Sequence, residues 1–318
     1  MTKAENFRRV LPGERREWIP VDYHGDLRYG EDAYTFIAHR GASAPEEEGG
    51  YDLWGVFWTS TEGSLLYPVE YPATTLEEAL AMPFPDIHNP SLWEEARAEA
   101  DAARDNSVII AFLVCALWER LWSLVGFETA LIGLVKEPEL ASAVLQRIAD
   151  WQVATADHFM EVGVGAARIT DDYGAQNDLL MKPDTWRRVI RPHLARMVDY
   201  YQQAGVPVIL HSCGKLARIM DDLMGMGFAA FNIQTNINDL VALRKRYGRR
   251  FCVWGGVSTQ LLTSGTPSQV KEAVRQAAES LGRDGGLILA PDQYIPIPEE
   301  NLRAFYEATE EVQTLPTV

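Results

Sequence analysis

Residues 206–234 read VPVILHSCGKLARIMDDLMGMGFAAFNIQ, and this stretch is the clearest guide to the fold. Two short apolar runs, Pro207–Leu210 and Ala229–Ile233, enclose a helical pattern over Leu216–Met226 that is followed by Gly227. Apolar runs of this length are typical of parallel strands buried on both faces, and glycine commonly follows the last turn of a helix. The stretch therefore predicts one strand–helix–strand unit of a parallel sheet.

The same alternation continues on both sides of this unit. Further apolar runs, bounded by polar residues, glycine or proline, are Trp54–Trp58, Val108–Phe112, Ala167–Thr170, Phe251–Trp254 and Leu287–Ala290, with Trp18–Val21 as a candidate eighth. Helical patterns cover Glu137–Val162, Lys182–Ala204, Asn238–Tyr247 and Pro267–Leu281. This order predicts an α/β fold, a (β/α)₈ TIM barrel, in which residues 1–318 form a single domain. The proline-rich segment Leu66–Ala103 is expected to be an irregular N-terminal excursion that packs over the barrel.

Composition narrows the classes of function. The formal net charge of −16 repels phosphate groups, so nucleic acid and membrane surfaces are poor partners. The longest apolar stretch, around Ser107–Leu117, is too short to cross a bilayer, and the N-terminus lacks the apolar core of a secretory signal. The three cysteines suit a reducing compartment, so we expect a cytoplasmic protein.

Polar residues follow the predicted strands, where the loops of a barrel build the active site. His211 and Cys213 are two residues apart at a strand end, so both side chains leave the same face and can bind one Zn²⁺ ion. A histidine packed beside an inert buried thiol explains this spacing equally well. Cys115 and Cys252 lie within or just after apolar runs and are expected to be buried.

Asp171 and Asp172 follow the run Ala167–Thr170. Because side chains alternate along a strand, only one of these carboxylates points inward, where it can bind a metal, hold a substrate hydroxyl or deliver a proton. The alternative is a helix N-cap. Among the aromatic residues, Trp58, Phe112 and Trp254 are the candidate walls of a pocket for an apolar ligand.

Three stretches resemble a known family. They are residues 171–234, residues 253–274 (VWGGVSTQLLTSGTPSQVKEAV) and residues 285–301 (GGLILAPDQYIPIPEEN). The order of HSCG, WGG, LAP and PEEN within them is similar to that of the uroporphyrinogen decarboxylase superfamily, in its corrinoid-dependent methyltransferase branch. The match is clear over Ala167–Ala308, and YDLWGVFW at residues 51–58 extends it more weakly. The family fold is a (β/α)₈ barrel, in agreement with the strand pattern.

The resemblance implies transfer of a methyl group from a small methylated, in particular methoxylated, substrate to the Co(I) of a corrinoid. No corrinoid-binding motif of the Asp-x-His-x-x-Gly type occurs in this sequence, so the corrinoid is expected on a partner protein. The methyltransferases hold zinc with a His-x-Cys pair and a second cysteine after LAP; here His211 and Cys213 match, but Gln293 replaces that cysteine. Asp292, Gln293 or Asp172 is expected to complete the metal site. Without a metal, His211 and Asp172 would act as the catalytic proton donor. The remaining candidates for contact with substrate are Asp171, Asn232, Gln234 and Tyr294.

Two other functions remain open at this point. A lyase of the uroporphyrinogen decarboxylase type would need an arginine-rich RQAGRY-type segment near the N-terminus, where this chain has only AHRGAS at residues 38–43. The third hypothesis is a barrel without catalytic activity that binds a small molecule. Nor does the sequence decide whether the methyl acceptor is a corrinoid or a thiol.

Overall fold

A curled parallel sheet organises the computed structural model, which describes residues 1–11, 16–38, 49–60, 66–103, 107–293 and 295–314. Its seven strands follow the order β1-β5-β6-β7-β8-β9-β10, and every neighbouring pair is parallel. The strands are β1 (Tyr34–Ile37), β5 (Val108–Leu113), β6 (Ala166–Thr170), β7 (Val208–Ser212), β8 (Ala230–Ile233), β9 (Val253–Val257) and β10 (Leu287–Pro291). Six of them coincide with predicted apolar runs, whereas β1 was not predicted.

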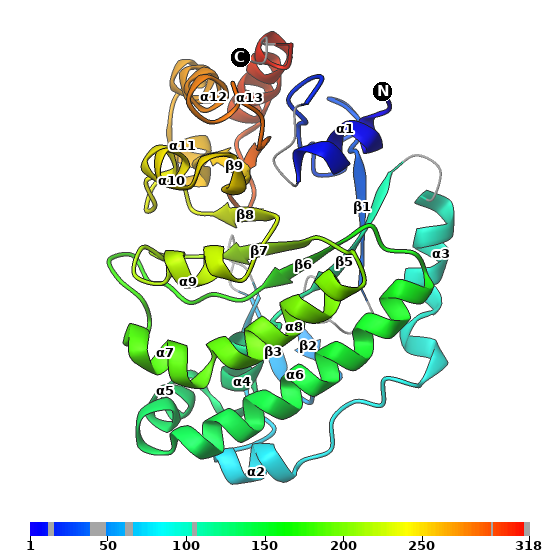
Figure 1. Ribbon diagram of the computed structural model, residues 1–318, viewed down its shortest axis with the longest axis vertical. Coiled ribbons are helices and arrows are strands. Elements are labelled where there is room, and N and C mark those ends of the chain that lie inside the picture. Colours follow the sequence, from blue (N-terminus) through cyan, green and yellow to red (C-terminus); the bar gives the residue numbers. More distant parts are fainter. Residues whose placement is uncertain (12–15, 39–48, 61–65, 104–106, 294, 315–318) are drawn as a thin grey trace.

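Helices cover the outer face of this sheet (Figure 1). They are α4 (Trp118–Val125), α5 (Phe127–Lys136), α6 (Pro138–Glu161), α7 (Pro183–Val189), α8 (Arg191–Gln203), α9 (Met220–Gly225), α10 (Leu240–Tyr247), α11 (Thr259–Ser264), α12 (Pro267–Leu281) and α13 (Glu299–Val312). Their apolar faces and the outward side chains of the strands form the larger hydrophobic core. None of the helices in the described ranges has the length and apolar character needed to cross a membrane.

A second, smaller core fills the inside of the curl. Side chains that alternate with the outer ones, such as Ile110, Ile209 and Trp254, meet there, and Cys252 is fully buried among them. Helix α1 (Lys3–Val10) closes one end, because its Phe7 ring lies 5.5 Å from Tyr34 and 5.4 Å from Trp254, measured between ring centroids. The loops that follow the strands, which carry the active site in barrel enzymes, lie towards the opposite end.

The segment Pro20–Gly25 occupies the eighth position, beside β10. Val21 forms a parallel bridge with Leu289, and the Leu289 N–H donates to the Pro20 carbonyl at 2.8 Å. No backbone pairing joins this segment to β1 within the described residues, so the curled α/β sheet is established but closure into a complete barrel is not. We call the boundary between Pro20–Gly25 and β1 the seam. Across it, the Tyr34 hydroxyl donates to Asp22 at 2.5 Å.

The prediction that Trp54–Trp58 forms a barrel strand is wrong. Phe57–Thr59 is strand β3 of a separate antiparallel sheet with β2 (Gly50–Tyr51) and β4 (Tyr67–Glu70). The run is interrupted by a turn, in which the Asp52 carboxylate accepts the backbone N–H groups of Trp54 and Val56. The predicted excursion continues from β4 into α2 (Leu76–Ala81), η1 (Pro90–Leu92) and α3 (Glu94–Ala103), and α2 packs against α6.

A buried ion pair fastens this small sheet to the main fold. Arg120 on α4 donates to the Asp52 carboxylate at 2.8 Å, and the side chains of both residues are at most 2% exposed. The Trp58 indole N–H donates to the same carboxylate oxygen at 3.1 Å, and the Arg120 guanidinium lies 4.7 Å from the centroid of the Trp54 ring. Trp58 is therefore a structural residue of this junction.

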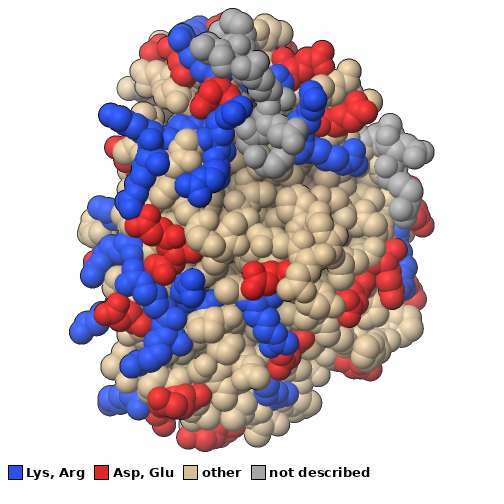
Figure 2. Space-filling model, in the orientation of Figure 1, with Lys and Arg blue, Asp and Glu red and all other residues tan. Residues whose placement is uncertain are grey.

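Positive charge is unevenly spread over the molecule. Figure 2 shows Lys and Arg side chains gathered along the side where Figure 1 places α9 and α10, with a broad uncharged area beside them. Many of these cations have carboxylate partners: Arg187 pairs with Asp222 at 2.9 Å and Arg246 with Asp221 at 2.6 Å. This side is therefore less cationic than its arginine content suggests.

Candidate functional site

A histidine, a cysteine and a carboxylate meet at the ends of β6 and β7. The Nε2 atom of His211 lies 3.6 Å from the Sγ atom of Cys213 and 4.0 Å from the nearer carboxylate oxygen of Asp172. The three potential ligand atoms all lie within 4.8 Å of one another, and each residue is partly exposed. We call these three residues the His–Cys–Asp cluster.

Two glycines let the loops that carry this cluster touch. Gly214 follows Cys213, and a Cβ atom at this position would lie 2.0 Å from the Gly174 carbonyl carbon. Gly214 also has a φ angle of +77°, which other residues adopt only with strain. The loop after β6 can therefore approach the loop after β7, and the Cys213 N–H donates to Asp172 at 2.7 Å.

The hydrogen bonds around Asn232 set the tautomer of His211. The Asn232 side-chain oxygen lies 2.5 Å from Nη2 of Arg168 and 2.5 Å from Nδ1 of His211, while its amide nitrogen donates to the Trp254 carbonyl at 2.7 Å. Because a guanidinium only donates, the atom that faces both Arg168 and His211 must be the oxygen. Nδ1 of His211 therefore carries the proton, and the Nε2 lone pair faces Cys213 and Asp172.

This arrangement is the usual one for a metal-binding histidine, whose second nitrogen donates to a neighbouring acceptor. Burial lowers the pKa of His211, and the charge of Arg168 lowers it further, which favours the neutral, ligand form. Burial also raises the pKa of the Cys213 thiol, so a nearby cation is needed to hold it as a thiolate. One nitrogen, one sulfur and one carboxylate oxygen fit the donor preferences of Zn²⁺.

Replacing Asn232 with leucine should weaken zinc binding by about 10- to 100-fold, because His211 would lose the acceptor that orients it. Titration of the purified protein with zinc against a chromogenic chelator measures the change. Asn232→Asp keeps an acceptor oxygen and should retain most of the affinity. Asn236→Leu, at an exposed position that bonds Gln260, serves as the control. Equal zinc affinity in Asn232→Leu and the unmodified protein would refute the role given to Asn232.

Gln293 reaches the cluster from the loop after β10. Its side-chain amide nitrogen lies 2.8 Å from the Cys213 sulfur. The Thr259 hydroxyl holds the backbone of Gln293, accepting its N–H at 2.9 Å and donating to its carbonyl at 3.1 Å. Gln293 is thus placed beside the candidate ligands, with an amide where a second thiolate was expected.

The structure does not bring Asp171 or Asp292 to the cluster. Asp171 is fully buried and accepts the N–H groups of Trp118 and Glu119, so it caps the start of α4. Burial raises its pKa to about 6. Both oxygens of Asp292 likewise accept backbone N–H groups, from Thr235 and Thr259, and the residue is 2% exposed, so it holds the neighbouring loops outside the cluster.

The other predicted substrate contacts fall into three groups. Gln234 accepts the Gly214 N–H at 2.7 Å and lies in the loop beside Cys213. Trp58 and Trp254 are 6% and 0% exposed and belong to the core, not to a pocket wall. Tyr294 and residues 39–43 of the AHRGAS segment lie outside the described residues.

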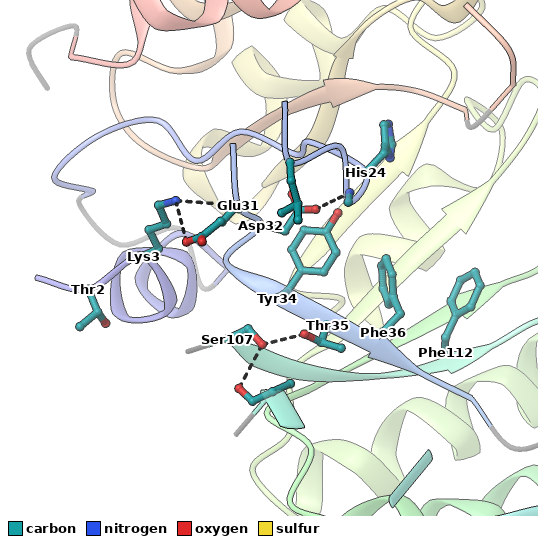
Figure 3. Close-up of a pocket in the computed structure, with 13 residues that line it drawn as sticks. Thr2, Lys3, His24, Glu31, Asp32, Tyr34, Thr35, Phe36, Ser107 and Phe112 are labelled. Carbon is teal, nitrogen blue, oxygen red and sulfur yellow. Dashed lines mark hydrogen bonds and ion pairs between the residues drawn. The ribbon is translucent and has the colours of Figure 1, made fainter. Parts of the chain in front are cut away.

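Phe112, in contrast, lines a cavity of about 1090 Å³ beside β1. Tyr34, Phe36, His24 and Asp32 also line this cavity, and sequence reasoning missed all four (Figure 3). A second cavity of about 440 Å³ is lined by His24 and Gln293, among others. His24 therefore borders both cavities, and the smaller one reaches the residue that contacts Cys213.

Arg168 was also missed, although it carried a signal. It is a charged residue inside the apolar strand β6, and it is 2% exposed. Its guanidinium carbon lies 5.4, 5.7 and 5.3 Å from the ring centroids of Phe36, Phe112 and Trp254. One layer of side chains therefore connects the wall of the larger cavity, through Asn232, with His211.

A curled parallel sheet with a cluster of potential metal ligands at the carboxyl ends of its strands is an arrangement typical of α/β enzymes that carry their site on the loops after the strands. The family model described as uroporphyrinogen decarboxylase (URO-D) matches residues 68–312. The chain belongs to the uroporphyrinogen decarboxylase family.

Two curated relatives carry different activities in their names. A methylcobamide:CoM methyltransferase, MtaA, from Methanosarcina barkeri is 26% identical over 192 residues, which are 59% of this chain and 54% of that protein. A uroporphyrinogen decarboxylase from Crocosphaera subtropica is 22% identical over 182 residues, 56% of this chain and 49% of that protein. The chain thus matches about half the length of each relative.

A solved structure shares the fold over nearly the whole chain. A methyltransferase from Methanosarcina mazei superposes with a TM-score of 0.77 at 17% sequence identity, covering 98% of this chain and 99% of that one. At this identity the likeness establishes the fold alone. The two curated relatives named here are thus a methyltransferase and a decarboxylase.

Proposed function

We propose that this protein transfers a methyl group from a small methoxylated substrate to the Co(I) of a corrinoid carried by a separate partner protein. The observation that carries the proposal is the His–Cys–Asp cluster, in which the free lone pair of His211 faces Cys213 and Asp172. The similarity to the Methanosarcina barkeri methyltransferase supports it. We further propose that residues 1–318 form one (β/α)₈ domain with Pro20–Gly25 as the eighth strand.

His211, Cys213 and Asp172 would hold a zinc ion. When bound, this ion supplies a Lewis acid that stabilises negative charge on the oxygen from which the methyl group leaves. The bond between the methyl carbon and that oxygen breaks as the carbon–cobalt bond forms, and the oxygen keeps the electron pair. Asn232 and Arg168 hold His211 in its ligand orientation while this charge develops. In a metal-free alternative, Asp172 would deliver a proton to the same oxygen.

The cavity lining argues against a decarboxylase that binds a substrate with several carboxylates. Among the described residues around the larger cavity, Lys3 is the one lysine or arginine, and its ammonium lies 3.8 Å from the Glu31 carboxylate. Asp32 adds a further negative charge to this wall. A substrate with many carboxylates would therefore meet like charges here.

The proposal is tested by incubating the purified, zinc-loaded chain with chemically reduced cobalamin and methylated compounds under anaerobic conditions. Formation of methylcobalamin, followed by its absorbance, is expected with methoxylated donors. Absence of methylcobalamin formation with every donor tested would overturn the proposal and favour a binding protein without catalytic activity. Release of CO₂ from a carboxylated substrate, without methyl transfer, would support the decarboxylase instead.

A further inference from the structure

We infer that the larger cavity holds the substrate of the proposed reaction, and that this substrate is a flat-ring methyl donor bearing a hydroxyl or amine group. The inference rests on the proposed function. It adds a binding site that shares none of the residues of the His–Cys–Asp cluster and is linked to it by the smaller cavity, which is lined by both His24 and Gln293. Its volume of about 1090 Å³ is large enough for a ring of this kind.

Three aromatic rings form one wall of this cavity. Tyr34 and Phe36 are two residues apart on β1, so both rings leave the same face of the strand, and Phe112 stands next to them on β5 (Figure 3). The Phe36 ring centroid lies 4.9 Å from that of Tyr34 and 4.9 Å from that of Phe112. Phe36 and Phe112 remain partly exposed. A flat ring can therefore pack against them with little loss of entropy.

The carboxylate of Asp32 lies in another part of the lining of the larger cavity, where it provides a hydrogen-bond acceptor. The Asp32 carboxylate accepts the N–H groups of Tyr23 at 2.6 Å and Gly25 at 2.8 Å, which fix its direction. Asp32 is partly exposed, and burial raises its pKa to about 6, so it is mostly ionised at neutral pH. An ionised carboxylate accepts hydrogen bonds from hydroxyl or amine groups and repels a carboxylated ligand.

Two connections lead from the ring wall to the cluster. Arg168 lies over the Phe36 and Phe112 rings and bonds Asn232, which bonds His211. The smaller cavity shares His24 with the larger one and reaches Gln293, whose amide is 2.8 Å from the Cys213 sulfur. Arg168 and Asn232 thus lie between the aromatic wall and His211, and the smaller cavity is the route by which the methoxy group of a bound ring would extend towards the proposed metal ligands.

Calorimetric titration of the full chain without cobalamin tests the inference. The probes are 4-methoxyphenol, which has a hydroxyl donor, 1,4-dimethoxybenzene, which has none, and 4-methoxybenzoate, which is an anion. We expect 4-methoxyphenol to bind about tenfold more tightly than 1,4-dimethoxybenzene, because it gives Asp32 a hydrogen bond to a charged acceptor. The 4-methoxybenzoate anion should bind most weakly of the three.

Asp32→Asn should remove this preference for the hydroxyl, and Phe36→Leu and Phe112→Leu should each weaken binding of 4-methoxyphenol by about fivefold. Asp199→Asn and Phe127→Leu, at exposed positions on α8 and α5, are the matched controls. Absence of binding by all three probes, or equal binding in the cavity variants and the controls, would overturn the inference.

The same variants separate this inference from the proposed function. Tight, Asp32-dependent binding without any methylcobalamin formation would refute the methyl transfer and support the ligand class of the cavity. Methyl transfer from 4-methoxyphenol at an unchanged rate and KM in Phe36→Leu and Asp32→Asn would refute the cavity assignment and support the transfer.

Discussion

His211→Ala and Cys213→Ser are each expected to lose bound zinc and to slow methyl transfer by at least about a thousandfold. His211 supplies the nitrogen ligand of the cluster and Cys213 supplies its sulfur ligand. Either change therefore removes one of the three protein ligands. Elemental analysis of the purified variants measures the zinc content. The rate of methylcobalamin formation measures the transfer.

Unmodified protein should contain about one zinc ion per chain, because three protein ligands with one open position are typical of a catalytic zinc site. His193→Ala is the matched control: His193 lies on α8, away from the cluster, and contacts the Ser142 hydroxyl at 2.9 Å. It should keep both metal and activity. Metal-free unmodified protein that still demethylates a donor with Co(I) would disprove the zinc assignment and favour Asp172 as proton donor.

Arg120→Met is expected to lower the free energy of unfolding by about 3–5 kcal/mol, because it leaves the Asp52 carboxylate buried without its cation. Asp52 is completely buried and would keep its bonds to backbone N–H groups and to the Trp58 indole, but these do not neutralise its charge. Urea denaturation, followed by the fluorescence of the tryptophans, measures the change.

Two further variants show whether the charge is the cause. Arg120→Met combined with Asp52→Asn removes both charges but keeps an acceptor oxygen, so it should recover much of the loss. Arg218→Met breaks an exposed ion pair with Asp178 and should cost at most about 1 kcal/mol. A loss in Arg120→Met no larger than in Arg218→Met would show that the buried pair contributes little.

The sequence predicted the strands that are continuous apolar runs with glycine or proline at their ends. That pattern describes β5 to β10 well, because strands buried on both faces have no polar side. It failed at Trp54–Trp58, since a short apolar run suits an antiparallel sheet equally well. It also missed β1, whose four residues, Tyr34–Ile37, directly follow the polar GEDA segment and are only half-buried at Thr35 and Phe36.

The site was predictable only where sequence neighbours share a strand end. The spacing of His211 and Cys213 put both on one face, and the end of the adjacent strand supplied Asp172. The roles of Asp171 and Asp292 depend instead on their contacts in the folded protein. Each accepts a backbone N–H group from the start of a helix that is distant in sequence. The run Trp18–Val21 was a candidate eighth strand and its Val21 does pair with β10, but nothing in the sequence indicated that His24 and Asp32 would then line a cavity.

Strand β1, which lines the larger cavity, is attached differently on its two sides. Within the sheet, β1 is joined to β5 by a continuous ladder over Tyr34–Ile37, and this side can move only by unzipping that ladder. Across the seam, the contacts with Pro20–Gly25 are hydrogen bonds that involve side chains. The Tyr34 hydroxyl donates to Asp22, and the Asp32 carboxylate accepts the backbone N–H groups of Tyr23 and Gly25. Side-chain hydrogen bonds can break one at a time, so we expect the cavity to widen at the seam before β1 separates from β5.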